Sequence, residues 1–208
     1  MLFLTWIFTC LLKGFRKASK AIVLAGYEPA TIYKYFRKQG ARIGEGCVIS
    51  TKLLGTEPYL VSLGNRVWIS GDVVFHTHDG GVWVLRDNRP SLDIFGPIII
   101  EDNCIIGVGA QLLPNIRIGR NSIVGPGSVV ISDVPPYSIV MGVPARPISS
   151  FAKYQEKCLA RWEVQKPPDV DTEKIGWGQS KDVQNKLRRH LTELFMNQAQ
   201  EEKGNADK

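Results

Sequence analysis

The chain has 208 residues, 44% of them hydrophobic and 22% charged, which is an ordinary globular composition with enough length for one well-buried domain. Lysine and arginine outnumber aspartate and glutamate by 26 to 20, a net charge of +6, and this favours an anionic ligand such as a nucleotide phosphate, or an acidic membrane surface. No recognised nucleic-acid-binding module is present, so nucleic acid is not expected as a partner.

The first twelve residues, MLFLTWIFTCLL, are almost wholly apolar and are followed by Lys13, Arg16, Lys17 and Lys20. A bilayer span needs about 20 residues, so this run is too short to cross a membrane. It also lacks the basic residues that precede the apolar run of a cleaved signal peptide. Two interpretations remain: residues 1–20 make peripheral contact with an anionic membrane, or they cap the core or a partner subunit.

A helix is predicted over Glu28–Gln39, and a repeat of six residues begins after it. The repeat is marked by an aliphatic or aromatic residue at every sixth position, in two blocks that differ in phase. The first block has Ile43, Ile49, Leu63, Ile69 and Phe75, and the second has Ile100, Ile106, Leu112, Ile118, Val124 and Val130. Residues 54–61 and about 79–97 interrupt the repeat and are predicted to be insertions between coils.

Six residues can form a short strand and a tight corner, which is one side of a polygonal solenoid. Three sides make a triangular coil of about eighteen residues, with the repeat residues stacked inside and glycines and asparagines at the corners. An ordinary α/β sheet would need helix-length segments between its strands, and the repeat region has none. The pattern therefore predicts an all-β parallel β-helix.

Helices are expected again after the last coil, at Ser149–Arg161 and Asp182–Glu202, with a linker over Lys166–Gly178 and a disordered tail of six residues. We therefore divide the chain into an N-terminal apolar and helical segment (1–40), a β-helix (41–148) and a C-terminal helical extension (149–208). The four cysteines have no metal-type spacing, and Cys47 and Cys104 fall in apolar repeats as buried thiols. A reducing, cytoplasmic location fits best, with the inner face of the membrane as a possible site of association.

Four stretches together resemble the hexapeptide-repeat acyltransferases, in particular the galactoside, maltose, capsular polysaccharide and xenobiotic O-acetyltransferases. They are the hexads, GTEPYLVSLG (55–64), VVFHTHDGGVWVLR (73–86) and IGRNSIVGPGSVVISDVPPYSIVMGVPARPI (118–148). The resemblance covers about half the chain. It implies a left-handed helix, a homotrimer with active sites between subunits, and acetyl-CoA as co-substrate.

Acetyl transfer to a hydroxyl needs a base, and a neutral histidine suits that role near pH 7. His190 lies beside Arg188 and Arg189 in a helical segment, where a solvated surface position is expected. Of the remaining two, His78 matches the family pattern V-x-F-x-T-H-D, so the resemblance makes His78 the general base and His76 a variable position. Asp79 adjoins His78 and is the candidate to orient it, although a backbone carbonyl could do so instead.

The resemblance also suggests where the acceptor and the cofactor bind. Trp83, Arg86 and Glu57 are the candidates for contacting a sugar or glycan acceptor, and the loop of Trp83 could equally dock a neighbouring subunit. The pantetheine arm would pass Gly107, Val108, Gly109, Gly125, Gly127 and Ser128, with Arg120 and Arg146 as phosphate partners. Two residues depart from the family: Pro126, which has no N–H to donate, and Ile105, where relatives often have tryptophan.

The predicted function is therefore acetyl-CoA-dependent O-acetylation of a sugar or glycan, such as a polysaccharide or lipid-linked precursor. An antibiotic or an amino-sugar nitrogen remains an alternative acceptor, and a non-catalytic trimeric scaffold or binding module is an alternative role. A γ-class carbonic anhydrase would need three histidines around zinc, which the chain cannot supply, so no metal is expected.

Overall fold

The structure is a computed structural model that describes residues 26, 28–168, 170 and 180–206. The predictions for residues 1–20 and for most of the linker lie outside these described residues. The chain divides into two compact units, Met1–Ala152 and Lys153–Lys208. Among the described residues, no helix is both long and apolar enough to cross a membrane.

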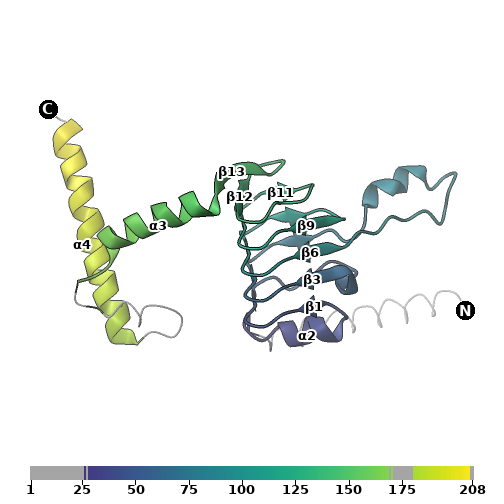
Figure 1. Ribbon diagram of the computed structural model, residues 1–208, viewed down its shortest axis with the longest axis horizontal. Helices are drawn as coiled ribbons and strands as arrows, with labels where there is room; N and C mark the ends of the chain where they lie inside the picture. Colours follow the sequence, from purple (N-terminus) through teal and green to yellow (C-terminus); the bar gives the residue numbers. More distant parts are fainter. Residues whose placement is uncertain (1–25, 27, 169, 171–179, 207–208) are drawn as a thin grey trace, which may run out of the picture. The chain divides into compact units, whose positions relative to one another are not determined.

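The first unit is a parallel β-helix, and its three complete coils each place one short strand in each of three sheets (Figure 1). The first sheet has β1 (Arg42–Ile43), β3 (Val61–Leu63), β6 (Ile98–Ile100) and β9 (Ile116–Ile118). The second has β2 (Val48–Ile49), β4 (Trp68–Ile69), β7 (Ile105–Ile106), β10 (Ile123–Val124), β12 (Ser138–Met141) and β13 (Arg146–Ser150). The third has β5 (Val74–Phe75), β8 (Gln111–Leu112) and β11 (Val129–Val130). All pairings between these strands are parallel except β12 with β13.

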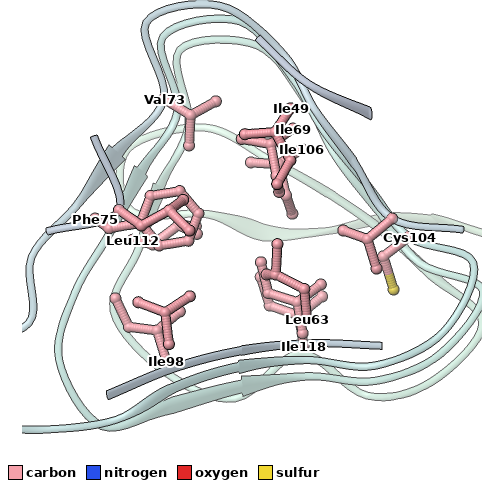
Figure 2. Close-up of a cluster of buried hydrophobic side chains, with 14 of the residues drawn as sticks. Ile49, Leu63, Ile69, Val73, Phe75, Ile98, Cys104, Ile106, Leu112 and Ile118 are labelled. Atoms are coloured by element: carbon pink, nitrogen blue, oxygen red, sulfur yellow. The ribbon is translucent and has the colours of Figure 1, made fainter. Parts of the chain in front are cut away.

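The repeat residues form the core of the coils, as predicted. Figure 2 looks down the triangular cross-section, where Ile49, Ile69 and Ile106 stack along the second sheet and Phe75 lies over Leu112 on the third. All eleven repeat residues that the sequence pattern marks are buried. Complete burial of such a side chain contributes about 1.5–3 kcal/mol, so this interior column is the main source of stability in the β-helix.

The corners make two demands on their residues, a positive φ at some positions and close approach of the next coil at others. Asn103, Asn115 and Asn121 adopt positive φ, which the short polar asparagine side chain tolerates. Gly107, by contrast, directly follows a repeat aliphatic and is needed for close approach, because a Cβ there would meet the backbone nitrogen of Pro126 at 2.5 Å. At position 107, glycine therefore serves coil-to-coil packing rather than an unusual backbone angle.

The two interruptions of the repeat differ in size. Val48 pairs with Trp68, a step of 20 residues, whereas Ile105 pairs with Ile123, a step of 18. Only two residues are therefore added near 54–61, and the prediction of an insertion throughout that stretch is wrong. Leu54 is fully buried as part of a coil, the 3-10 helix η1 (Pro58–Leu60) follows, and Val61 already belongs to β3.

The second interruption is a long loop. Val61 pairs with Ile98, a step of 37 residues, so this coil is 19 residues longer than the next one, in which Ile98 pairs with Ile116 at a step of 18. The extra residues carry the 3-10 helix η2 (Gly80–Leu85) and project from the side of the coils, as Figure 1 shows.

The helices differ from prediction at their ends. Of the helix expected over 28–39, only α2 (Tyr33–Lys38) is regular, and a turn closed by the amide of Ile32 on the carbonyl of Glu28 precedes it. In the second unit, α3 (Phe151–Gln165) begins later than expected because residues 149–150 extend β13. The helix α4 (Lys181–Ala206) continues past residue 202, the predicted end of this helix; an established helix adds further residues at little cost.

Candidate active site

His78 lies at the neck of the long loop. The chain leaves the third sheet after Phe75, and residues 77–79 then pair with residues 94–96 on the return: Gly96 donates to the carbonyl of Thr77 at 3.0 Å and Asp79 donates to that of Ile94 at 2.9 Å. Between these two bonds His78 and Phe95 form an antiparallel bridge. This short two-stranded neck fixes the backbone of His78 while the loop extends beyond it.

The imidazole of His78 is held by residues of the preceding coil. Its Nδ1 lies 3.1 Å from Oε2 of Glu57 and 3.0 Å from the hydroxyl of Thr56. The His78 side chain is 39% exposed, whereas that of Glu57 is only 16% exposed. In the described structure its Nε2 makes no hydrogen bond, so Nε2 is the nitrogen left for a reactant.

Two threonine hydroxyls hold the carboxylate in place. Thr77 donates to Oε2 of Glu57 at 2.6 Å and accepts from the Glu57 amide at 3.3 Å, while Thr56 donates to the same Oε2 at 2.7 Å. Thr77 is 1% exposed, so its hydroxyl has little freedom to turn away. Glu57, Thr56 and Thr77 thus form a small network, which we call the Glu57 clamp, that presents one carboxylate oxygen to His78.

The clamp also determines the ionisation of its carboxyl group. Burial by itself would raise the pKa of Glu57, but hydrogen bonds from Thr77, Thr56 and His78 outweigh it and leave the pKa below its ordinary value. Glu57 is therefore ionised throughout the neutral range. An ionised carboxylate at Nδ1 favours the tautomer with a proton on Nδ1 and a free lone pair on Nε2.

A glycine makes the clamp possible. Gly55 has a φ of +71°, and a Cβ at this position would lie 2.5 Å from Oγ1 of Thr77 and 2.8 Å from its Cγ2. Any other residue would both strain the backbone and displace Thr77. The segment Gly55–Glu57, which the repeat pattern assigned to an insertion, thus supplies the surroundings of the histidine.

A groove of about 990 Å³ runs beside His78. It is lined by residues 50–56 and 72–78, together with Tyr35, Phe36, Gln39, Pro58 and Gly80. We call this the His78 groove. The groove extends along the face of the first two coils that ends in β5, from the neck of the loop to α2. It gives a ligand access to the imidazole.

The structure gives Asp79 a different contact from the one expected. Its carboxylate accepts from the amide of Gly81 at 2.8 Å and so caps η2. The contact at Nδ1 of His78 is made by Glu57, which the sequence assigned to the acceptor. Adjacent side chains of an extended segment point apart, which explains why the nearest carboxylate in sequence is not the one that reaches the ring.

The two candidate acceptor-binding residues on the long loop, Trp83 and Arg86, have surroundings of their own. Trp83 is 73% exposed on η2. Arg86 donates to the carbonyl of Leu92 at 3.0 Å and to Asp93 at 3.1 Å, and its guanidinium lies 6.0 Å from the ring centre of Trp83. Within this chain, Arg86 therefore holds the two arms of the loop together.

The other two histidines have structural partners or surroundings of their own. His76 faces outward on the third sheet, with Nε2 3.2 Å from Oε1 of Gln111. His190, expected at a solvated surface, is half-buried in α4, and its Nε2 is buried with no partner among the described residues. No group of three or more His, Cys, Asp or Glu side chains that could hold a metal occurs in the described part of the chain.

The candidate cofactor residues fall at different corners. Gly107, Val108 and Gly109 connect the second sheet to the third, and Gly125, Gly127 and Ser128 stack on them in the next coil. Arg120 lies between the first and second sheets, where its guanidinium is 5.9 Å from the ring centre of Tyr137. Arg146, in β13, is exposed and donates to the carbonyl of Ala145 at 3.1 Å.

The glycine amides at the corner between the second and third sheets already donate hydrogen bonds inside the β-helix. The amides of Gly107, Gly109, Gly125 and Gly127 donate to Val124, Gly71, Val140 and Val108 respectively. Ser128 is fully buried, and its hydroxyl accepts from Gly142 at 3.2 Å. These four amides are therefore not free donors for a pantetheine arm, because they already donate to carbonyls of neighbouring coils. The corner still offers open surface, since a Cβ at Gly109 or Gly127 would meet no atom within 4 Å.

A triangular parallel β-helix with a histidine at the neck of an inserted loop defines the class of the protein, and comparison with known proteins agrees. The family model described as "Bacterial transferase hexapeptide (six repeats)" matches residues 97–132. Protein CapG of Staphylococcus aureus is 41% identical over 142 residues, which cover 67% of this chain and 83% of CapG. The chain belongs to the hexapeptide-repeat transferase family, and the prediction of an acyltransferase is confirmed at that level.

Other relatives match over smaller parts of their length. Galactoside O-acetyltransferase of Escherichia coli is 31% identical over 60% of this chain and 60% of its own length. A 2,3,4,5-tetrahydropyridine-2,6-dicarboxylate N-acetyltransferase of Brevibacillus brevis is 40% identical over 33% of this chain and 28% of its own. Among solved structures, a hexapeptide-repeat-containing acetyltransferase of Vibrio cholerae has a TM-score of 0.52 at 23% identity, over 68% of this chain and 91% of that one, and supports the fold.

Proposed function

We propose that the protein is an acetyl-CoA-dependent O-acetyltransferase that acetylates a hydroxyl of a sugar or glycan, with His78 as the general base. The observation that carries the proposal is the imidazole of His78, which is held at Nδ1 by the Glu57 clamp and lies in the lining of an open groove, with Nε2 not engaged by that clamp. The names of the relatives support acetyl as the transferred group and a galactoside hydroxyl as one acceptor in the family.

The chemistry follows from the state of the ring. The neutral imidazole takes the proton of the acceptor hydroxyl on Nε2 while the hydroxyl oxygen attacks the thioester carbonyl of acetyl-CoA. As the C–S bond breaks, the imidazolium returns the proton to the sulfur of the departing coenzyme A. The products are an acetyl ester and free coenzyme A, and His78 is again neutral.

Glu57 acts through His78 rather than on the acceptor. The ring becomes positively charged during the reaction, and the ionised carboxylate 3.1 Å from Nδ1 stabilises that charge. The two threonines matter because they keep the carboxylate ionised and aimed at the ring. We assign Glu57 as a positioning residue, and Asp79 as a cap of the loop helix.

Assembly would complete the site. We infer that the β-helix winds to the left and that three copies associate, as in the family that the chain resembles. Loop side chains with large exposed apolar surfaces, Trp83, Val84, Leu85 and Phe95, suit contact with a neighbouring subunit. The thioester arm would then lie along the open corner of Gly109 and Gly127, with Arg146 available to its phosphates.

Release of free thiol from acetyl-CoA, measured with and without candidate glycans, tests the proposal. We expect coenzyme A release to depend on the acceptor and the acetylated sugar to be detected by mass spectrometry. Acceptor-dependent transfer to an amine but to no hydroxyl would replace the O-acetyltransferase assignment with N-acetylation. Binding of glycans without any turnover would favour the non-catalytic module.

A further inference from the structure

The His78 groove is larger than one sugar ring requires. Its volume of about 990 Å³ is near the top of the range of about 300–1,000 Å³ that is typical of sites for drug-sized ligands. A single ring with its reacting hydroxyl at Nε2 of His78 would occupy one end only. The remainder runs along residues 50–54 and β5 to the side chains of Tyr35, on α2, and Gln39, at the C-cap of that helix.

Side chains along this remainder combine two kinds of surface. Leu53 is 56% exposed and Val74 is 43% exposed, and the half-buried Tyr35 adds an aromatic face. Gln39 and His76 also line the groove and supply polar groups, although Nε2 of His76 already lies 3.2 Å from Gln111. A pyranose has the same duality, since its C–H faces pack on apolar and aromatic side chains while its hydroxyls need polar partners.

The groove shows no preference for a charged ligand. Its lining holds one lysine, Lys52, and one aspartate, Asp72, both exposed, and their formal charges cancel. An acceptor that carries carboxylates or phosphates on each sugar would find no cluster of cations along this surface. The lining therefore favours neutral sugars.

We propose that the acceptor is a neutral glycan of at least two sugars, with the acetylated sugar at His78 and the adjoining sugars in the groove up to Gln39 and Tyr35. The inference rests on the proposed function and specifies the substrate class for the same site. The adjoining sugars add binding energy away from the reacting hydroxyl, so a longer acceptor binds more tightly than a single sugar of the same kind.

The experiment compares methyl glycosides with linear trisaccharides of the same sugar, using glucose, galactose and N-acetylglucosamine, in the acetyl-CoA assay with the full chain. For the sugar that is accepted, we expect the KM of the trisaccharide to be at least about 10-fold lower, which corresponds to about 1.4 kcal/mol. In Gln39→Ala and in Leu53→Asp that ratio should fall toward one. Lys38→Ala, an exposed neighbour on α2 outside the lining, is the matched control and should keep the wild-type ratio.

The outcomes separate the two proposals. Equal KM values for monosaccharide and trisaccharide in the wild type would overturn the extended site while leaving O-acetylation intact, as would a ratio that survives in both groove variants. A trisaccharide of uronic acids that outperforms the neutral one would contradict the neutral class. Absence of acceptor-dependent coenzyme A release with every sugar would instead count against the proposed function itself.

Discussion

Nδ1 of His78 lies 3.1 Å from Oε2 of Glu57, although the two residues belong to successive coils and are 21 positions apart in the chain. The two residues meet because the parallel coils stack on one another, which places Glu57 of one coil beside His78 of the following coil. The same stacking holds Thr56 and Thr77 around the Glu57 carboxylate, so the contact depends on both coils.

Replacing the base should abolish most of the activity without unfolding the chain. In His78→Ala we expect coenzyme A release to fall by about 100-fold or more, because the acceptor hydroxyl loses its proton acceptor. His78 is partly exposed at the neck of the loop, so the thermal midpoint should change little. His190→Ala, in the second unit, serves as the control and should keep the wild-type rate; an unaltered rate in His78→Ala would refute the assignment.

Removing the charge at Glu57 should affect turnover rather than binding. In Glu57→Gln we expect kcat to fall by about 10- to 100-fold while the KM of the acceptor stays near its wild-type value, because the residue orients and stabilises the ring. If Glu57 instead contacts the acceptor, the change will appear mainly in KM. Glu45→Gln, which removes only the surface ion pair with Arg37, should leave both constants unaltered.

The lowered pKa of Glu57 should make stability depend on acidity. The carboxylate is stabilised in the folded state, so its contribution is fully present above its ordinary pKa of 4.5 and is lost as the pH falls through the lower folded value. Thermal midpoints of the wild type should therefore decline below about pH 4.5 more steeply than those of Glu57→Gln. Parallel curves for the two proteins in this acidic range would argue against an ionised, clamped carboxylate.

A methyl group at Gly55 should disturb the site more than the fold. Both Gly55→Ala and Gly46→Ala place alanine at a positive φ, +71° and +68° respectively, so each should lose about 1–2 kcal/mol of unfolding free energy from backbone strain. Only at position 55 does the added Cβ also meet the Thr77 side chain. We therefore expect a clear loss of kcat in Gly55→Ala and none in Gly46→Ala, measured at a temperature where both are folded.

Thiol reactivity should report the packed corners of the β-helix. Burial is the largest influence on Cys104 and raises its pKa to about 11, and it also raises the pKa of Cys47. Cys158 is exposed on α3. Iodoacetamide at pH 8 should thus label Cys158 in the native protein and spare Cys47 and Cys104 until denaturant is added; mass spectrometry of the peptides would show early labelling of Cys104 if the corner were open.

Sequence patterns predicted the β-helix well because its repeat is local. An interior aliphatic every six residues implies a strand and a corner, and the buried column of Ile49, Ile69 and Ile106 is where the pattern placed it. Patterns failed where a coil departs slightly from the repeat. The pattern predicts an insertion over residues 54–61 because two added residues shift the phase, yet Leu54 still packs inside the coil.

The candidate site likewise combines residues that the sequence marks with residues that only the structure reveals. His78 and the long loop stand out in the sequence through the T-H-D motif, whereas the partner of His78 does not. Asp79 is adjacent in sequence but turns to cap η2, and Glu57 reaches the ring from the coil before. A shared network of Thr56, Thr77 and Glu57 has no signature in a single sequence, because its members meet only when the coils stack in register.

The amino-acid sequence by itself determined the solenoid and its buried column, since both depend on spacing within a few residues, and the resemblance to a known family marked His78 as the candidate base. Tertiary structure alone decided which carboxylate faces the imidazole and that the corner amides are already bonded. The pairing of neighbouring coils sets both, and the step between paired residues changes along the chain from 20 to 37 and then to 18 residues. Such steps bring distant residues together by register, which local spacing does not encode.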